Sequence, residues 1–151
     1  MAGSAGQWVV DTHAACRTKG EMHMRFMMMV KGGADYEAGV APRQDLMRAV
    51  GQLTKEMIDA GVLVDSGGLL PSSAGARVRA SKGQLYVTDG PFPETKELIG
   101  GYAVVYAGSK REAIELGRRF MGLHADILGP SYEGEVEIRQ FVDSQPTPEG
   151  D

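Results

Sequence analysis

Only two segments of this chain carry apolar residues at the spacing of an α-helix, and this limits the folds that it can adopt. One helix is expected to start at Pro42 and end at Gly61, with an apolar stripe of Leu46, Val50, Leu53 and Met57. The other follows a capping box of Ser109 and Glu112, with a stripe of Ala113, Leu116, Gly117 and Phe120. A doubly wound sheet needs more helices than these two. We therefore expect a single α+β domain.

Short strand-like runs separate and flank the two helices. In chain order they cover residues 25–31, 62–64, 77–80, 85–88, 98–107 and 136–142. Between the third and fourth runs, the segment 81–84 is expected to form a tight hairpin turn in which Gly83 supplies a positive φ. Two right-handed crossovers would place both helices on one face of a single sheet. The expected fold is a ferredoxin-like sandwich with an added β-hairpin.

The loop between the fourth and fifth strands, residues 89–97, contains three carboxylates, a lysine and one rigid Gly-Pro joint. Packing of a core does not require so much charge in so short a turn, so we expect a functional site here. Phe92 is interpreted as a hydrophobic plug under the loop, with a stacking platform as the alternative. Glu94 and Lys96 belong either to a solvated face with weak ion pairs or to a gate on a pocket.

Asp89 is open to two interpretations. Its carboxylate could cap the backbone N–H groups of the turn that follows, as aspartate commonly does. Alternatively, Asp89 shares one side of its strand with Leu85 and Val87, and burial of that side would raise its pKa and make it a candidate acid or base. Both roles can hold together, so both remain predictions at this point.

Three tyrosines on the neighbouring strands, Tyr86, Tyr102 and Tyr106, either line a cavity with their hydroxyls inward or pack with their hydroxyls at its rim. With the loop, they complete the set of candidate site residues. The candidate catalytic residue is Asp89, and the candidate ligand-binding residues are Asp89, Phe92, Glu94, Lys96, Tyr86 and Tyr102.

The composition argues against several other classes of protein. A net charge of −4 gives no basic face for direct nucleic-acid binding, and no apolar run approaches the roughly 18 residues that span a membrane. Cys16 is the only cysteine, so there is no intrachain disulfide, and a reducing cytoplasm fits. One cysteine and three histidines argue against a zinc site, and no phosphate-loop or dinucleotide-binding pattern occurs. We expect neither a metal nor a cofactor.

The two ends of the chain differ from the rest. Residues 1–22 have neither helical nor strand periodicity, and we expect them to be a disordered N-terminal extension. Residues 144–151 are polar, contain two prolines and are expected to form a flexible tail. The folded domain is therefore expected to cover residues 23–143.

The segment Asp89-Gly90-Pro91-Phe92, with residues 94–97 and 100–102 after it, resembles the signature of the DGPF branch of the YCII-related family. The order of elements from Met24 to Val142 is similar too. The resemblance implies a dimeric α+β barrel built from ferredoxin-like subunits. The activity of this family is largely unassigned. Some members are encoded beside alternative sigma factors, which implies a link to sigma-factor regulation.

The chain departs from the family pattern at one point. The better-studied branch carries a histidine near the start of the first helix, proposed to form an acid–base pair with an aspartate. The corresponding residues here, 42–46, contain no histidine. The remaining candidates, His23 and His124, cannot be placed at the loop from sequence, so the His–Asp chemistry does not carry over.

The strands at residues 25–31 and 102–107 are apolar on both faces, although two helices can cover only one face of a sheet. We therefore expect a homodimer in which the uncovered faces pack together. The favoured function is a small-ligand-binding or regulatory module that acts as this homodimer. The alternative is a cofactor-independent enzyme in which Asp89 is the acid or base and a tyrosine hydroxyl assists, so enzymatic activity is left open.

Overall fold

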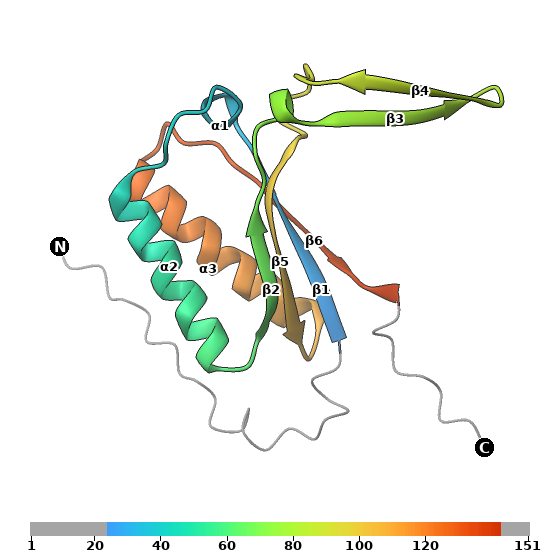
Figure 1. Cartoon of the computed structure of the whole chain (residues 1–151). Coiled ribbons are helices and arrows are strands. Elements are labelled where there is room, and N and C mark those ends of the chain that lie inside the picture. Colours follow the sequence, from blue (N-terminus) through green and yellow to red (C-terminus); the bar gives the residue numbers. More distant parts are fainter. Residues whose placement is uncertain (1–23, 143–151) are drawn as a thin grey trace, which may run out of the picture.

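The computed structural model describes residues 24–142 (Figure 1). Its elements are β1 (Met24–Lys31), α1 (Ala34–Glu37), α2 (Gln44–Asp59), β2 (Leu63–Gly68), the 3-10 helix η2 (Ser72–Ala74), β3 (Ala76–Ser81), β4 (Gln84–Asp89), β5 (Ile99–Ala107), α3 (Lys110–Leu128) and β6 (Val136–Gln140). The predictions made for residues 1–22 and 144–151, and the position of His23, lie outside the described residues.

Four strands form the main sheet in the order β2-β5-β1-β6, and every neighbouring pair is antiparallel. Both long helices, α2 and α3, lie on one face of this sheet (Figure 1). The class is α+β, and the topology is consistent with the predicted ferredoxin-like sandwich. The hairpin β3–β4 is a separate two-stranded sheet that projects from the domain, and we call it the arm.

The hydrophobic core lies between the main sheet and the helices. Strand β1 contributes Phe26 and Met28 to it, β5 contributes Val105, and all three side chains are buried. Because successive side chains in a strand point to opposite faces, Met27 and Met29 lie on the side of the sheet that no helix covers. We call this side the open face. As predicted, the two long helices of the described residues lie on one face of the sheet, and neither lies on the open face.

The ends of α2 and the start of α3 can be compared with the helix boundaries expected from the sequence. Helix α2 begins at Gln44 with Arg43 as its N-cap, so Pro42 precedes the helix and does not occupy its first turn. Gly61, with φ of 70°, follows the helix as expected. The capping box of α3 is confirmed, because the Ser109 side chain accepts a hydrogen bond from the Glu112 N–H at 3.2 Å.

From the sequence, the helical stripe ends at Phe120 and a loop with His124 and Asp126 is expected to follow, and this prediction is wrong. Helix α3 continues through both residues to Leu128 and ends only at Gly129, whose φ is 83°. The residues between Phe120 and Gly129 contain no proline, and Gly129 is the position that takes the left-handed backbone at the end of the helix. His124 therefore lies on a helix, where its ring stacks on Tyr132 and its Nδ1 lies 2.9 Å from the Phe120 carbonyl oxygen.

Two short elements appear in segments that we expected to be loops. Helix α1 spans four residues and η2 spans three, which is too short for an apolar stripe to mark either of them. The ring of Tyr36 in α1 packs over glycines: a Cβ on Gly100 would lie 3.3 Å from its Cε1 atom. From the sequence, Gly100-Gly101 is expected to mark a bulge or a close backbone approach, and the structure has both. The β1–β5 register shifts beside Gly100, and a Cβ on Gly101 would lie 3.2 Å from the Gly67 carbonyl oxygen.

The arm has the predicted tight turn and two unlike faces. Lys82 and Gly83 both have positive φ, 51° and 76°, as a two-residue hairpin turn requires. Residues directly opposite each other share a face, so the pairing places the apolar side chains together. One face carries Ala76, Val78, Ala80, Leu85, Val87 and Asp89, and the other carries Arg77, Arg79, Ser81, Gln84, Tyr86 and Thr88.

Candidate functional site

The loop of residues 89–97, which we call the motif loop, is anchored directly on η2. The Gly90 N–H donates to the Gly75 carbonyl oxygen at 2.9 Å. A Cβ atom on Gly90 would overlap the carbonyl oxygen of Ser72, so the two backbones meet where no side chain fits. Glycine is required here because of this close approach.

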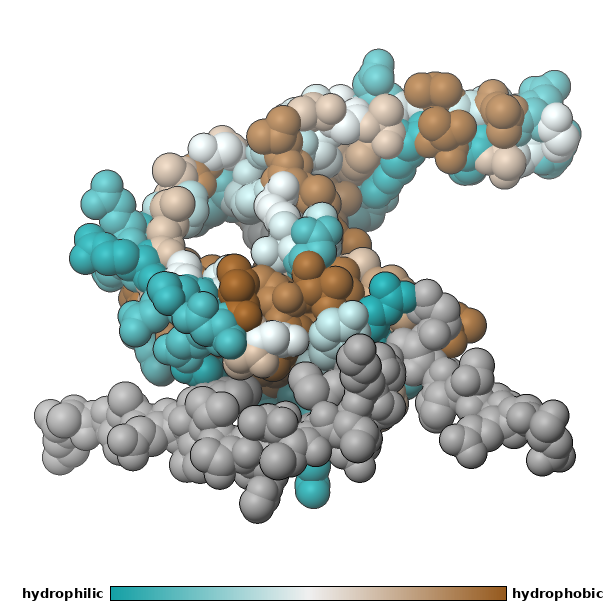
Figure 2. Space-filling model, turned by 60° about the horizontal axis from the view of Figure 1, so that its bottom comes forward, coloured by the Kyte–Doolittle hydropathy of each residue, from teal (hydrophilic) through white to brown (hydrophobic). Residues whose placement is uncertain are grey.

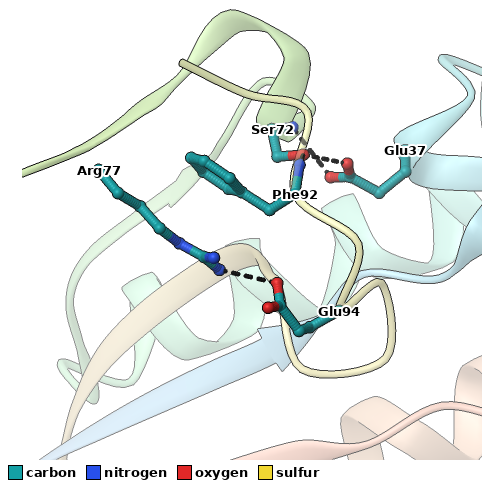
Figure 3. A network of polar contacts seen from close by, with 5 residues as sticks. All are labelled: Glu37, Ser72, Arg77, Phe92 and Glu94. Atoms are coloured by element: carbon teal, nitrogen blue, oxygen red, sulfur yellow. Dashed lines mark hydrogen bonds and ion pairs between the residues drawn. The ribbon is translucent and has the colours of Figure 1, made fainter. Parts of the chain in front are cut away.

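Ser72 connects the motif loop to α1 (Figure 3). Its N–H donates to Glu37 Oε1 at 2.9 Å and its hydroxyl donates to Glu37 Oε2. The same hydroxyl oxygen accepts the Phe92 N–H at 3.0 Å. Sequence reasoning did not find Glu37 or Ser72, because both lie in expected loops and neither falls in a periodic pattern.

Arg77 holds the side chains of the motif loop from β3 (Figure 3). Its guanidinium carbon lies 3.8 Å from the centroid of the Phe92 ring, within the range of a cation–π contact. Its Nη2 atom donates to Glu94 Oε2 at 3.1 Å, and this hydrogen bond holds the pKa of the Glu94 carboxyl below its usual value. Phe92 is half-buried, and Arg77 of its own chain lies over its ring. A role for Phe92 in ligand binding stays a prediction.

The end of the motif loop is tied to the open face of the main sheet. The Lys31 amine lies 3.3 Å from Glu97 Oε2 and 3.9 Å from Glu137 Oε1. The Lys31 side chain is only 11% exposed, although Glu97 remains in solvent. This lysine therefore joins β1, β6 and the loop in one ion-pair cluster.

The structure corrects both descriptions of the surroundings of Asp89. The side chain lies on the apolar face of the arm, opposite Ala76, but it is exposed in the single chain because the arm projects from the domain. The capping interpretation is wrong, since the N–H groups of Gly90 and Phe92 bond to Gly75 and Ser72. A role for Asp89 in ligand binding or catalysis stays a prediction.

The candidate tyrosines do not form one group. Tyr86 lies on the polar face of the arm, where its hydroxyl donates to Gln84 Oε1 at 3.0 Å. Tyr102 lies in the main sheet beside Met29, and its hydroxyl donates to Asp65 Oδ2 at 3.2 Å. The negative charge of Asp65 and this hydrogen bond raise the pKa of Tyr102. Tyr86 and Tyr102 belong to separate sheets, so the alternative in which the three tyrosines line one cavity does not hold within a single chain.

Lys96 is exposed. Within the described residues, its side chain forms no hydrogen bond or ion pair with another candidate residue.

On the open face, a shallow depression lies over the middle of β1 and the end of β6. It is lined by Met27, Met29, Arg139, Gln140, Phe141 and Val142. The Arg25 guanidinium carbon lies 4.8 Å from the centroid of the ring of Phe141, which is one of these lining residues.

Two other kinds of feature are absent from residues 24–142. Within this range, no group of three or more His, Cys, Asp or Glu side chains is placed to hold a metal ion. Nor does any helix in this range combine the length and the apolar character that crossing a membrane requires.

Comparison with known proteins identifies the family. The model of the YCII-related domain matches residues 24–125, which include β1, both long helices for most of their length, the arm and the motif loop. An uncharacterised protein of Rhizobium meliloti (strain 1021) is 36% identical over 73 residues, which cover 48% of this chain and 59% of that protein. Because the family model matches more than half of the chain, this protein belongs to the YCII-related family.

Proposed function

We propose that this protein is a small-ligand-binding or regulatory module that works as a homodimer and holds its ligand on the open face of the main sheet. The observation that carries the proposal is the chemistry of that face. Met27, Met29 and Arg139 all line the depression, so apolar side chains and one guanidinium lie together there. Sites for small molecules are mostly apolar with a few placed polar groups, and this face has that character.

A second polar side chain, that of Tyr102, lies next to these methionines. Tyr102 pairs with Met29 across β1 and β5, and Asp65 orients its hydroxyl. A hydroxyl that donates to a carboxylate keeps its oxygen available to accept a hydrogen bond from a ligand. The site would therefore offer an acceptor on one side and the guanidinium of Arg139 on the other.

The dimer would enclose this site. Helices α2 and α3 cover one face of the main sheet and leave the other without a helix (Figure 1). Two such faces packed together, about 10 Å apart, would bury the methionines and convert the open depression into a cavity between two copies. Two-fold symmetry is the commonest arrangement for such a pair.

A regulatory role, including the link to an alternative sigma factor that the family resemblance implies, would follow from ligand occupancy of the dimer. No nucleophile–base pair stands out among the residues that border the depression, which favours binding over catalysis. In this role the ligand shifts the population of dimer conformations that a partner protein meets.

The ligand site can be tested by NMR on protein labelled with ¹³C-methyl methionine and mixed with a library of small organic fragments. We expect bound fragments to shift the methyl signals of Met27 and Met29 on the open face. Met28 is the matched control, because it lies between them in sequence and is buried against the helices. Fragments that shift Met28 equally, or no fragment that shifts Met27 or Met29, would contradict the site.

The dimer has its own test. Light scattering coupled to gel filtration should give a mass close to twice the 16.2 kDa of one chain. A mass of one chain at micromolar concentration would overturn the sheet-to-sheet dimer.

A further inference from the structure

The arm exposes a continuous apolar face that its own domain does not cover. Val78, Leu85 and Val87 are 68%, 75% and 70% exposed, and they lie on one side of the hairpin. Figure 2 shows apolar side chains gathered along this projection, away from the apolar surface of the main domain. Soluble proteins rarely leave contiguous apolar patches in water, and such patches mark interaction surfaces.

The arm also lacks the support that a stable hairpin needs. It forms its own sheet of two strands, with six residues in each. Two strands alone are at best marginally stable in water, and a hydrophobic face normally has to pack against something else. The arm therefore needs an occupant for its apolar face.

We propose that the arm docks on a second copy of this chain, with the face that carries Val78, Leu85 and Val87 packed against the partner. The inference rests on the homodimer proposed above and assigns a specific segment to its interface. The arm projects on the side of the domain away from α2 and α3, which is the side that a copy on the open face would occupy (Figure 1). The polar face, with Arg77, Arg79 and Thr88, would remain in solvent.

The area of the main sheet supports this assignment. Four short strands spaced by about 4.8 Å offer on the order of 400 Å² of open face. A stable dimer commonly buries about 800 Å² on each partner. One face of the arm, roughly 20 Å long and 10 Å wide, adds on the order of 200 Å². Each copy would bury the face of its own arm and the surface on which the arm of the partner docks. These two areas would add to that of the sheet and bring the total near the area that a stable dimer buries.

The motif loop gives the arm a fixed direction. Both strands of the arm are joined at their base by the Gly90–Gly75 hydrogen bond. Arg77, at the start of β3, is held by the Phe92 ring and by Glu94, and the Phe92 N–H is bound by Ser72. In this interpretation the motif residues position the arm for its partner. A segment held in its bound direction loses less entropy when it binds.

The test compares two neighbouring residues on opposite faces of β4 in the full chain. Val87 is placed on the docking face and Thr88 on the polar face, and both are exposed in the single chain. Each is replaced in turn by the photo-cross-linker p-benzoylphenylalanine, in a mixture of ¹⁴N- and ¹⁵N-labelled protein. We expect position 87, and not position 88, to give cross-linked peptides that contain one light and one heavy partner.

Aspartate substitutions at the same two positions test the contact through the dissociation constant of the dimer. Val87→Asp should weaken the dimer by about tenfold or more, because an aspartate without a partner is costly to bury. Thr88→Asp should change the dissociation constant by less than about twofold. Circular dichroism should show an unchanged fold for both, since neither side chain is packed in the single chain.

The outcomes separate this inference from the dimer itself. A wild-type protein of single-chain mass would overturn both proposals. A dimer in which position 87 cross-links only within its own chain, or not at all, would overturn the arm contact and leave the sheet-to-sheet dimer standing. Equal cross-linking from positions 87 and 88 would also overturn the assignment of the docking face.

Discussion

The carboxylate of Glu37 accepts both the backbone N–H and the hydroxyl of Ser72, and this joins α1 to η2. The hydroxyl oxygen also accepts the Phe92 N–H, so one side chain links three segments that are distant in the sequence. Ser72→Ala would leave two of these groups without partners in part-buried surroundings. We expect it to lower the free energy of unfolding by about 1–2 kcal/mol, measured by urea denaturation.

Ser73→Ala is the matched control for that change. Ser73 is the next residue of η2, it is exposed, and it takes no part in the contacts with Glu37 or Phe92. We expect its free energy of unfolding to stay within about 0.5 kcal/mol of the wild type. Similar losses from both substitutions would mean that the network adds nothing to stability.

A second prediction concerns the contact between Gly90 and Ser72. Gly90→Ala would place a methyl group on the Ser72 carbonyl, which is backbone and cannot move aside. We expect a loss of about 2 kcal/mol or more, seen as a lower thermal midpoint. Gly68→Ala is the control, since apart from Gly68 and its two chain neighbours no atom of the described residues lies within 4 Å of the position its Cβ would take. A Gly90→Ala variant with the same thermal midpoint as the wild type would contradict the close packing.

The third prediction concerns pH. Because the hydrogen bond from Arg77 lowers the pKa of Glu94, their interaction stabilises the fold above the ordinary pKa of glutamate. This stabilisation is lost as the pH falls through the lowered pKa. We expect a ¹³C NMR titration of the Glu94 carboxyl to give a value below the ordinary one, and Arg77→Met to raise it. An unchanged titration in the Arg77 variant would show that the pair does not form in solution.

The fourth prediction compares two glycines of α3. Glycine inside a helix costs about 0.5–1 kcal/mol relative to alanine. Apart from the nearby backbone of α3 itself, no atom of the described residues lies within 4 Å of a Cβ placed on Gly122. Gly122→Ala should therefore raise the free energy of unfolding by about that amount. A Cβ on Gly117 would lie 2.8 Å from Ile138 Cδ1, so Gly117→Ala should gain less or lose stability. Equal gains at both positions would show that α3 does not pack closely on β6.

The sequence predicted those parts of the fold that depend on local rules. The stripe from Leu46 to Met57, the Ser109 cap and the Lys82-Gly83 turn are each set by residues close together in the chain, and each is present. The uncovered sheet face was predictable too, since the count of helices and the alternation in β1 are both readable from the sequence.

The position of the motif loop could be predicted from the sequence, but its contacts could not. The motif loop is well connected, but its partners Glu37, Ser72 and Arg77 come from other segments. No spacing rule connects such residues, because only the folded backbone brings them together. The exposure of Asp89 had the same origin: the alternation on β4 placed it correctly beside Val87, but the projection of the arm decided its contact with water.

The position of β1 has a consequence for synthesis of the protein. This central strand is the first to leave the ribosome, yet its neighbour β6 is the last, and Phe26 pairs with Gln140. The main sheet therefore cannot close until almost the whole domain has been translated. The arm pairs only residues close in sequence, from Ala76 with Asp89 inward, so it can form as soon as it emerges. During this interval the nascent chain would expose the apolar face of the arm before the main sheet has formed.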